Sequence, residues 1–470
     1  MSLNLLSKID EMIDESSRDL VSDTIKLVNI KSVEGEPLDG APFGEGPKKV
    51  LDAFVEMSEK AGFYTKDYNV GVVSVALKGG CADLGIWLHG DVVPEGDGWR
   101  FDPYSAVEYK GCVIGRGATD NKGQLAAVYN LFKIFKELKV ELNYNPAIFL
   151  GSNEETGMND ISGIEGNPDA KGFINVATPP ALSLVPDGGF PVGYGGKGGM
   201  NITLRSKSPL RSLTFSAGQS SSPGLAVATL KTDKIPDELP NCEIKRGEVC
   251  EISAFTPPRH GAHPDPDGNM ITNLSAVLLD YDLVDDGDRR PLEFFRNVSS
   301  DIYGMCLGID TEHEILGKLT VFSKAVDFID GYVEFKLNIR YPITITYEEI
   351  VEKISKSAAD FGFSVKESSS GIIPYLLCND SDIIDALQKA AGELIPDISK
   401  PYTLSGGTYA HKLPNAYVFG MNGCLPPEDF PKGRGGAHGI DESVSIDRLK
   451  RAMKIYARAL LYLNEINFKK

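Results

Sequence analysis

A histidine and an aspartate follow a short apolar run in the segment Trp87-Leu88-His89-Gly90-Asp91. A neutral imidazole is a good zinc ligand, and a nearby carboxylate can accept its second ring N–H and so fix the orientation of the ring. Taken alone, a histidine in such a place is more often a structural residue than a ligand. The segment becomes informative only together with other polar residues that follow apolar runs.

Carboxylates occupy similar places farther along the chain. Asp120 follows a glycine-rich segment at the start of a predicted helix, where helix capping is the ordinary explanation. Glu154 and Glu155 come directly after an apolar run, and Asp187 follows another. Adjacent buried carboxylates repel each other and lose hydration, and a bound cation would relieve both effects.

A second histidine, His438, lies in the glycine-rich segment 435–439. Any one of these polar residues could belong to an ordinary turn. Together they form a donor set of two imidazoles and three carboxylates, which zinc, manganese and cobalt all accept. The residues that could supply these donors are His89, Asp120, Glu154 or Glu155, Asp187 and His438. Their joint occurrence is far more specific than any single segment and predicts a metal site.

The apolar runs that precede these residues have the length of buried strands. They cover residues 72–77, 84–88, 147–150 and 182–185, and a helical pattern fills residues 121–138 between them. Strands that alternate with helices favour an α/β layer with a largely parallel sheet, whose ligands bind beyond the carboxyl ends of the strands. This edge is where the candidate ligands fall.

The residue composition and the hydrophobic pattern of the sequence change after residue 187. Glycines crowd residues 188–199, and alternating strands such as 332–339 follow. A helical pattern covers the first 65 residues, which we expect to form an outer layer of helices. A helical pattern returns near residue 383 and covers residues 446–463. We therefore predict a discontinuous catalytic domain with an insertion. The predicted domains are residues 1–190 and 376–470 for the catalytic part and 191–375 for the inserted part.

The composition is that of a folded globular protein. The 470 residues are 42% hydrophobic and 24% charged, and the 66 acidic against 48 basic residues give a net charge of −18. This charge opposes binding to nucleic acid or to an anionic membrane. The seven cysteines lack any C-x-x-C pair, and neither a signal peptide nor an apolar run of about eighteen residues is present. We expect a cytoplasmic protein.

The five ligand-bearing segments resemble those of the M20 family of metallopeptidases, close to the bacterial dipeptidases of the PepV type, which are Xaa-His or carnosinase-like dipeptidases. The resemblance covers essentially the whole chain. It implies a zinc-peptidase-like α/β catalytic domain with a central mixed, mostly parallel sheet flanked by helices. It also implies an inserted α+β lid domain of double size, and such a chain would act as a monomer.

The resemblance also assigns roles to the candidate ligands. It implies that His89 and Asp187 bind one divalent ion, that Glu155 and His438 bind a second, and that Asp120 bridges the two. Zinc is the expected metal, and manganese and cobalt are alternatives. Two divalent ions against three carboxylates leave a positive centre that acidifies a water molecule between them.

By the same resemblance, Glu154 would be the general base that activates the water, and Asp91 would orient His89. The implied function is a metal-dependent dipeptidase that hydrolyses the peptide bond of unsubstituted dipeptides. The alternative is an M20-type amidohydrolase that removes the acyl group from N-acyl amino acids with the same metals. The presence of Glu154 with all five ligands argues against a catalytically inactive metal-binding protein.

The inserted domain adds candidate substrate contacts. The resemblance implies that His263 stabilises the oxyanion and that Arg340 forms a bidentate pair with the C-terminal carboxylate of the substrate. The segment Ser405-Gly406-Gly407 would add backbone donors to that carboxylate. Without the resemblance, Arg340 would be a solvated arginine on the polar face of a strand.

Overall fold

The computed structural model describes most of the chain. The described residues are 3–164, 167–207, 210, 213–217, 224–231, 234–256, 268–377, 381–421 and 425–468. They divide into two compact units. The first comprises residues 1–194, 377–402 and 408–470, and the second comprises residues 195–376 and 403–407. The segment 403–407, which the sequence analysis assigned to the catalytic domain, is therefore grouped with the second unit.

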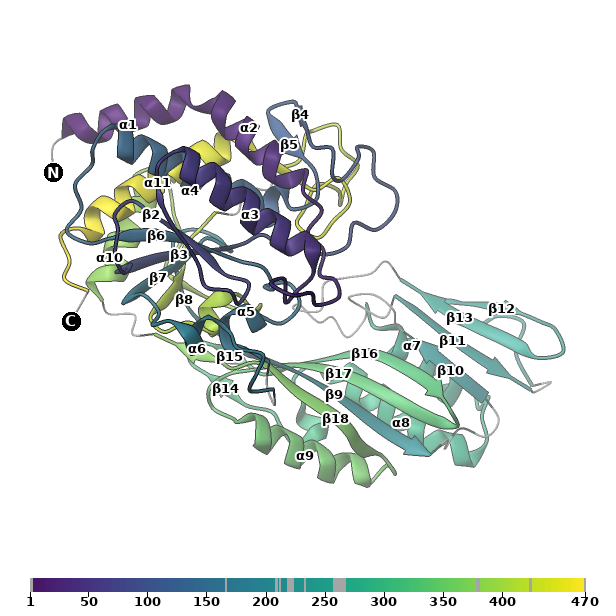
Figure 1. The fold of residues 1–470 in the computed structure, drawn as a ribbon. Coiled ribbons are helices and arrows are strands. Elements are labelled where there is room, and N and C mark those ends of the chain that lie inside the picture. Colours follow the sequence, from purple (N-terminus) through teal and green to yellow (C-terminus); the bar gives the residue numbers. More distant parts are fainter. Residues whose placement is uncertain are drawn as a thin grey trace. The chain divides into compact units, whose positions relative to one another are not determined.

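The first unit is built on a mixed sheet (Figure 1). The first six strands in its order are β1 (Tyr64–Asp67), β2 (Val73–Ala76), β6 (Pro146–Gly151), β3 (Leu84–His89), β7 (Leu182–Val185) and β21 (Ala416–Val418), and β8 (Gly193–Gly196) follows β21. At the centre, β3 pairs in parallel with both β6 and β7, and β7 pairs in parallel with β21. The outer pairs β1–β2 and β2–β6 are antiparallel. The predicted fold class, a mixed and mostly parallel sheet flanked by helices, is confirmed.

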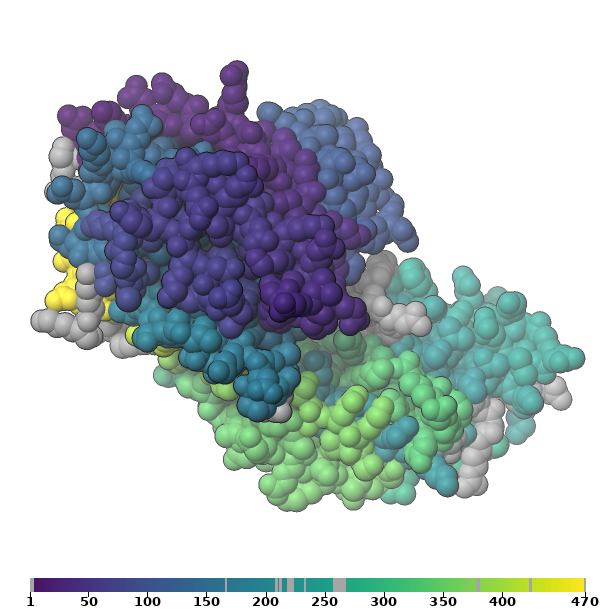
Figure 2. Space-filling view, in the orientation of Figure 1, coloured from purple at the N-terminus to yellow at the C-terminus, as the bar shows by residue number. Residues whose placement is uncertain are grey.

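Helices cover this sheet. They are α1 (Leu3–Glu15), α2 (Ser17–Val28), α3 (Glu45–Lys60), α4 (Gly123–Glu137), α5 (Asn159–Ser162), α6 (Phe173–Val176), α10 (Asp382–Gly392) and α11 (Ile446–Leu463). Helix α4 contacts α1, α2 and α11 and is buried on nearly all sides, as expected of a helix with an apolar sequence throughout. The N-terminal helices lie at the surface of the unit, as predicted (Figure 2). None of the described helices is long and apolar enough to cross a membrane.

A small three-stranded sheet joins two distant parts of the first unit. Strand β5 (Cys112–Ile114) pairs with β4 (Val107–Tyr109) on one side and with β22 (Ser443–Ser445) on the other. These short strands lie outside the apolar runs from which strands were predicted. The pairing of Ser443 with Ile114 holds the glycine-rich segment around His438 close to the segment that leads to Asp120.

The second unit is α+β. Its main sheet is antiparallel throughout and has the order β12 (Cys242–Lys245), β13 (Cys250–Phe255), β11 (Leu225–Leu230), β10 (Leu213–Ala217), β16 (Thr320–Ile329), β17 (Tyr332–Tyr341), β9 (Gly198–Lys207) and β18 (Ser364–Ile372). The helices α7 (Met270–Asp280), α8 (Asp286–Ser300) and α9 (Tyr347–Ala359) share one apolar core with this sheet. The alternation predicted for residues 332–339 is confirmed, because Val333, Phe335, Leu337 and Ile339 all enter that core.

Candidate metal centre

Three of the central strands deliver candidate ligands to the same edge of the sheet. His89 is the last residue of β3, Glu154 and Glu155 follow β6, and Asp187 follows β7. Because β3 lies between β6 and β7 and runs parallel to both, their carboxyl ends meet. The predicted location of the candidate site relative to the sheet is therefore what the structure shows.

Asp120 lies between the two histidines. It belongs to the irregular helical turn Ala118–Lys122 that precedes α4. Its Oδ1 is 3.0 Å from His89 Nε2, and its Oδ2 is 3.1 Å from His438 Nε2. Helix α4 begins later than predicted, at Gly123, and Asp120 makes no capping hydrogen bond to it. Capping, the ordinary explanation for Asp120, is thus excluded by the structure.

His438 reaches the site from the C-terminal part of the first unit. Its backbone has a φ of +59°, in the left-handed region, within a loop where glycines are frequent. Its Nε2 is 3.0 Å from Glu155 Oε2 as well as 3.1 Å from Asp120 Oδ2. The His438 side chain is 51% exposed, whereas that of His89 is 1% exposed. The site is therefore buried at His89 and open to solvent at His438.

The five predicted ligands form two groups that share one residue. Within each group the ligand atoms all lie within 4.8 Å of one another. One group is His89, Asp120 and Asp187, and the other is Asp120, Glu155 and His438. The structure thus brings all five residues together, in the pairing that the resemblance implied. The donor set fits two divalent cations that share a carboxylate.

The electrostatics of the site also fit bound cations. Burial, followed by repulsion from Asp120, raises the pKa of Asp187 to about 7. Hydrogen bonds with Asp120 and Glu155 raise the pKa of His438 to about 11. Burial lowers the pKa of His89, but its contacts with Asp120 and Asp91 outweigh this and raise it well above its usual value. Apart from burial, these pKa shifts arise because several carboxylates lie close together around the two imidazoles, an arrangement whose negative charge divalent cations would offset.

Glu154 lies beside the ligands without joining either group. Its Oε1 is buried and has no hydrogen-bond partner among the described residues. Burial, followed by repulsion from Asp187, raises the pKa of Glu154 well above its usual value. A carboxylate with a raised pKa and no competing partner suits proton transfer to and from a bound reactant.

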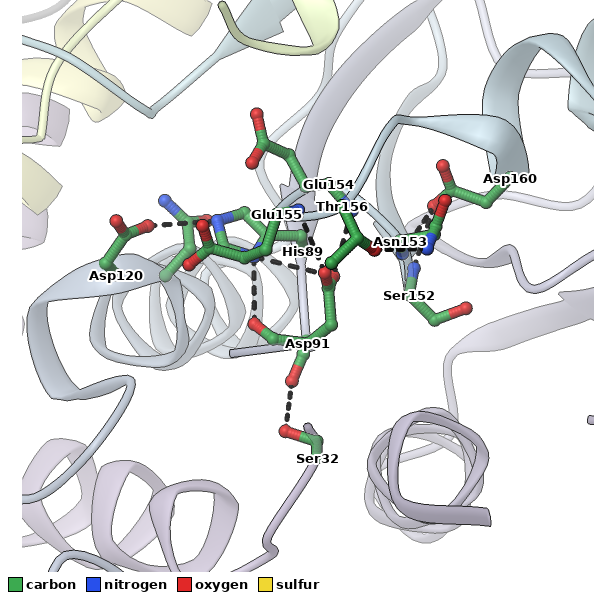
Figure 3. Close-up of polar contacts among 12 residues, drawn as sticks. Ser32, His89, Asp91, Asp120, Ser152, Asn153, Glu154, Glu155, Thr156 and Asp160 are labelled. Carbon is green, nitrogen blue, oxygen red and sulfur yellow. Dashed lines mark hydrogen bonds and ion pairs between the residues drawn. The ribbon is translucent and has the colours of Figure 1, made fainter. Parts of the chain in front are cut away.

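Asp91 uses its carboxylate differently from the expectation. His89 Nδ1 is 3.0 Å from the main-chain oxygen of Asp91 and 3.6 Å from its carboxylate Oδ1. The two carboxylate oxygens instead accept the backbone N–H groups of Glu154 and Glu155, at 3.1 and 3.0 Å (Figure 3). The hydrogen bond that orients the ring is therefore made by the main chain. The side chain of Asp91 holds the turn that carries the two glutamates.

The remaining predicted site residues belong to the second unit or lie outside the described residues. His263 lies outside the described residues. Arg340 lies on β17 in the second unit, on the sheet face opposite the apolar core, because it alternates with the core residue Ile339. Its Nε is buried without a hydrogen-bond partner among the described residues, and burial lowers its pKa. Ser405, Gly406 and Gly407 form a loop that is also grouped with the second unit.

Two residues that the sequence analysis missed support the loops of the site. Glu442 accepts the backbone N–H groups of Gly117, Thr119 and Asp120 at 2.9–3.0 Å. Arg116 donates to Glu442 Oε2 at 2.7 Å, and both side chains are fully buried. The only signal in the sequence is their nearness along the chain to Asp120 and His438.

A cluster of imidazoles and carboxylates at the carboxyl edge of an α/β sheet is the kind of site found in metal-dependent hydrolases. Residues 86–462 match the model of peptidase family M20/M25/M40. The chain belongs to this family and is accordingly a hydrolase that acts on peptide bonds. The predicted family and enzyme class are confirmed.

Similar proteins cover almost the whole chain. "Putative dipeptidase YtjP" of Bacillus subtilis (strain 168) is 28% identical over 470 residues, which are 95% of this chain and 97% of that protein. The crystal structure of human carnosine dipeptidase 1 matches with a TM-score of 0.58 at 15% identity, covering 98% of this chain and all of that one. The Bacillus subtilis YxeP protein, named a dinuclear metal binding peptidase from the M20 family, matches with a TM-score of 0.52 at 12% identity and covers 96% of this chain and 99% of that one. At these identities the two structures show the shared fold.

Proposed function

We propose that this protein is a metal-dependent dipeptidase that hydrolyses the peptide bond of unsubstituted dipeptides. The observation that carries the proposal is the pair of ligand groups that share Asp120, with the unpartnered carboxylate of Glu154 beside them. Membership in the peptidase family and the dipeptidase name of a relative along 95% of the chain also support it.

We assign two divalent ions, preferably zinc, to the two groups. His89, Asp120 and Asp187 would hold one ion, and Asp120, Glu155 and His438 would hold the other. When bound, such ions supply Lewis-acid polarisation of a carbonyl group and lower the pKa of water. The three ligand carboxylates offset part of their charge, and Asp91 fixes the turn that presents Glu155.

Glu154 acts as the general base and then as the general acid. It takes a proton from the attacking water as the water oxygen bonds to the carbonyl carbon. It then gives that proton to the amine nitrogen as the carbon–nitrogen bond breaks. A raised pKa suits both steps, because the carboxyl group must hold the proton between them. His263 is assigned to stabilise the negative charge that develops on the carbonyl oxygen.

Arg340 is assigned to the C-terminal carboxylate of the substrate. Its guanidinium forms no ion pair among the described residues, although neighbouring cations on the same sheet face do. Opposite Arg340 in the sheet is Gly199, and a side chain there would overlap the guanidinium. The backbone N–H groups of Ser405, Gly406 and Gly407 are assigned as additional donors. A group that binds the substrate carboxylate explains a preference for short, unsubstituted peptides.

The test of this function uses protein stripped with a chelator and reloaded separately with zinc, manganese or cobalt. Each form is incubated with a dipeptide, its C-terminal amide, a tripeptide and an N-acetyl amino acid, and products are quantified by mass spectrometry. We expect metal-dependent cleavage of the dipeptide, much slower cleavage of its amide, and no cleavage of the tripeptide or the N-acetyl amino acid. Faster release of acetate from the N-acetyl amino acid would instead identify a deacylase. Cleavage of nothing by any metal form would refute the proposal.

The role of Arg340 is tested with Arg340→Met and a matched control. The variant should lose the discrimination between the dipeptide and its amide, a loss of about 10- to 100-fold for one charge-assisted pair. Lys336→Met is the control, because Lys336 lies on the same strand face but is paired with Asp327 at 2.8 Å. It should keep the discrimination. Equal discrimination in wild type and Arg340→Met would exclude Arg340 from carboxylate binding.

A further inference from the structure

We propose that Asp160 is a positioning residue for Glu154 and Glu155, because its carboxylate fixes the first half of the turn that carries both. The inference rests on the proposed roles of these two glutamates. Asp160 lies at the start of the short helix α5, outside both ligand groups, and its side chain is completely buried.

The backbone of the turn is held by two carboxylates. Oδ2 of Asp160 accepts the N–H groups of Ser152 at 2.8 Å and Asn153 at 3.2 Å. Asp91 accepts the N–H groups of the next two residues, Glu154 and Glu155. Four consecutive N–H groups at the end of β6 thus each donate to a carboxylate oxygen (Figure 3). The two aspartates together fix the path of the chain through the turn.

Tyr409 completes this arrangement. Its hydroxyl group donates to Asp160 Oδ2 at 2.5 Å, and its ring lies edge-on to the ring of His89, with the ring centroids 6.5 Å apart. A side chain at Gly151, the last residue of β6, would overlap both the Tyr409 hydroxyl and Asp160 Oδ2. Glycine at position 151 therefore leaves the space in which these two groups meet the backbone.

Burial of the Asp160 carboxylate lowers the free energy of unfolding unless its contacts compensate for the lost hydration. Its Oδ1 has no hydrogen-bond partner among the described residues, and the three groups that donate to its Oδ2 are all uncharged. A buried carboxylate without a cation destabilises a fold. Three donors converge on the single oxygen Oδ2, and two of them are backbone N–H groups of the turn. We therefore infer that the Asp160 carboxylate serves to hold the backbone of the turn.

The position of the turn determines where the Glu154 and Glu155 side chains lie, because few side-chain contacts hold them. The buried Oε1 of Glu154 has no hydrogen-bond partner among the described residues, and the carboxylate of Glu155 pairs with His438, which comes from another loop. Loosening residues 152 and 153 would therefore displace both the proposed base and one proposed ligand. Displacements of this kind reduce both turnover and metal affinity.

The experiment compares Asp160→Ala with Asp160→Asn in the full-length protein. Zinc binding to the stripped protein is measured by competition with a chromophoric chelator, and kcat and KM are measured on a dipeptide well below the unfolding temperature. In Asp160→Ala, the affinity for one of the two zinc ions should fall about 10- to 100-fold, because Glu155 belongs to one ligand group only. The kcat should fall by a similar factor while KM stays within about threefold of wild type.

The Asp160→Asn variant distinguishes positioning of the turn by Asp160 from a general loss of fold stability. Asparagine keeps an oxygen that can accept the two backbone N–H groups, so both zinc affinities and kcat should return to within about threefold of wild type. Tyr409→Phe removes one of the three donors and should give an intermediate loss. Tyr144→Phe is its matched control, because Tyr144 is also a buried tyrosine, donates to Leu460 O at 2.7 Å and lies at the opposite end of β6. It should change neither quantity.

Several outcomes would overturn the inference. It fails if Asp160→Ala binds both zinc ions as wild type does, if both ions weaken equally, or if Tyr144→Phe has the effect of Tyr409→Phe. If Asp160→Ala does not fold, the comparison of Tyr409→Phe with Tyr144→Phe decides. A wild-type protein that binds two zinc ions but cleaves no dipeptide would refute the proposed function, and the zinc affinities of the variants would still test the inference.

Discussion

Arg116 offers the most demanding test of how the site is supported. It donates to Glu442 Oε2 at 2.7 Å and to the main-chain oxygens of Pro94, Glu95 and His438 at 3.2–3.4 Å. Glu442 in turn accepts the N–H group of Asp120, so one buried ion pair connects the loops of two proposed ligands. Arg116→Met should therefore destabilise the first unit and weaken metal binding.

The size of the effect follows from burial. Because both side chains are at most 2% exposed, removing one partner leaves the other charge buried and uncompensated, which costs about 3–5 kcal/mol. Each kcal/mol lowers the midpoint of thermal unfolding, Tm, by about 2–4 °C, so the Tm of Arg116→Met should be about 6–20 °C below that of wild type. A wild-type stability of about 8 kcal/mol or more, within the typical range of about 5–15 kcal/mol, leaves the variant folded at room temperature.

The assay is thermal unfolding of the metal-free protein, followed by circular dichroism, for Arg116→Met, Glu442→Gln and the double variant. The double variant removes both charges, so it should be more stable than Arg116→Met by about 1–3 kcal/mol. Burial raises the pKa of Glu442 to about 7, and Arg116 opposes this rise. Without Arg116 the pKa should rise further, and the stability deficit of Arg116→Met should be larger at pH 8 than at pH 6. A double variant no more stable than Arg116→Met would refute this reasoning.

Three further predictions concern the metals, the base and the assembly. Glu154→Gln should retain both zinc ions by elemental analysis but lose about 10²- to 10⁴-fold in kcat, and retained turnover would exclude Glu154 as the base. Zinc binding to the stripped protein should release protons and tighten as pH rises, because His438, with its pKa raised to about 11, must lose a proton to become a ligand. Calorimetry in buffers of different ionisation enthalpy measures this release, and its absence would contradict the assigned ligand. Sedimentation velocity should show a monomer, and an obligate dimer would contradict that expectation.

The ligand positions were predictable because each follows a recognisable pattern. His89, Glu155 and Asp187 stand where apolar runs of strand length end, and parallel strands bring such ends together. Asp120 and His438 lie in glycine-rich segments, whose irregular backbone is visible in the sequence even though its path is not. Residue type and position therefore indicated where a metal site would lie, whereas the choice of Glu155 rather than Glu154 as a ligand came from the resemblance to the M20 family.

The supporting residues were not predictable because their partners are distant in the sequence. Tyr409 and Asp160 are separated by 249 positions, and Arg116 and Glu442 by 326. Such contacts leave no trace in local periodicity, and a buried carboxylate looks the same in the sequence as an exposed one. The local prediction for Asp91 also missed a feature, because spacing does not distinguish the main-chain oxygen of a residue from its carboxylate.

The pairing of β22 with β5 has a consequence for biosynthesis. It joins β22 to a strand that is made much earlier, and His438 belongs to the segment that leads to β22. A ribosome-bound chain can contain His89, Asp120 and Asp187 while the ligand group completed by His438 is still missing. The proposed two-ion centre can therefore form only after His438 has been synthesised, so a nascent chain that ends before His438 would lack one ligand of the proposed centre.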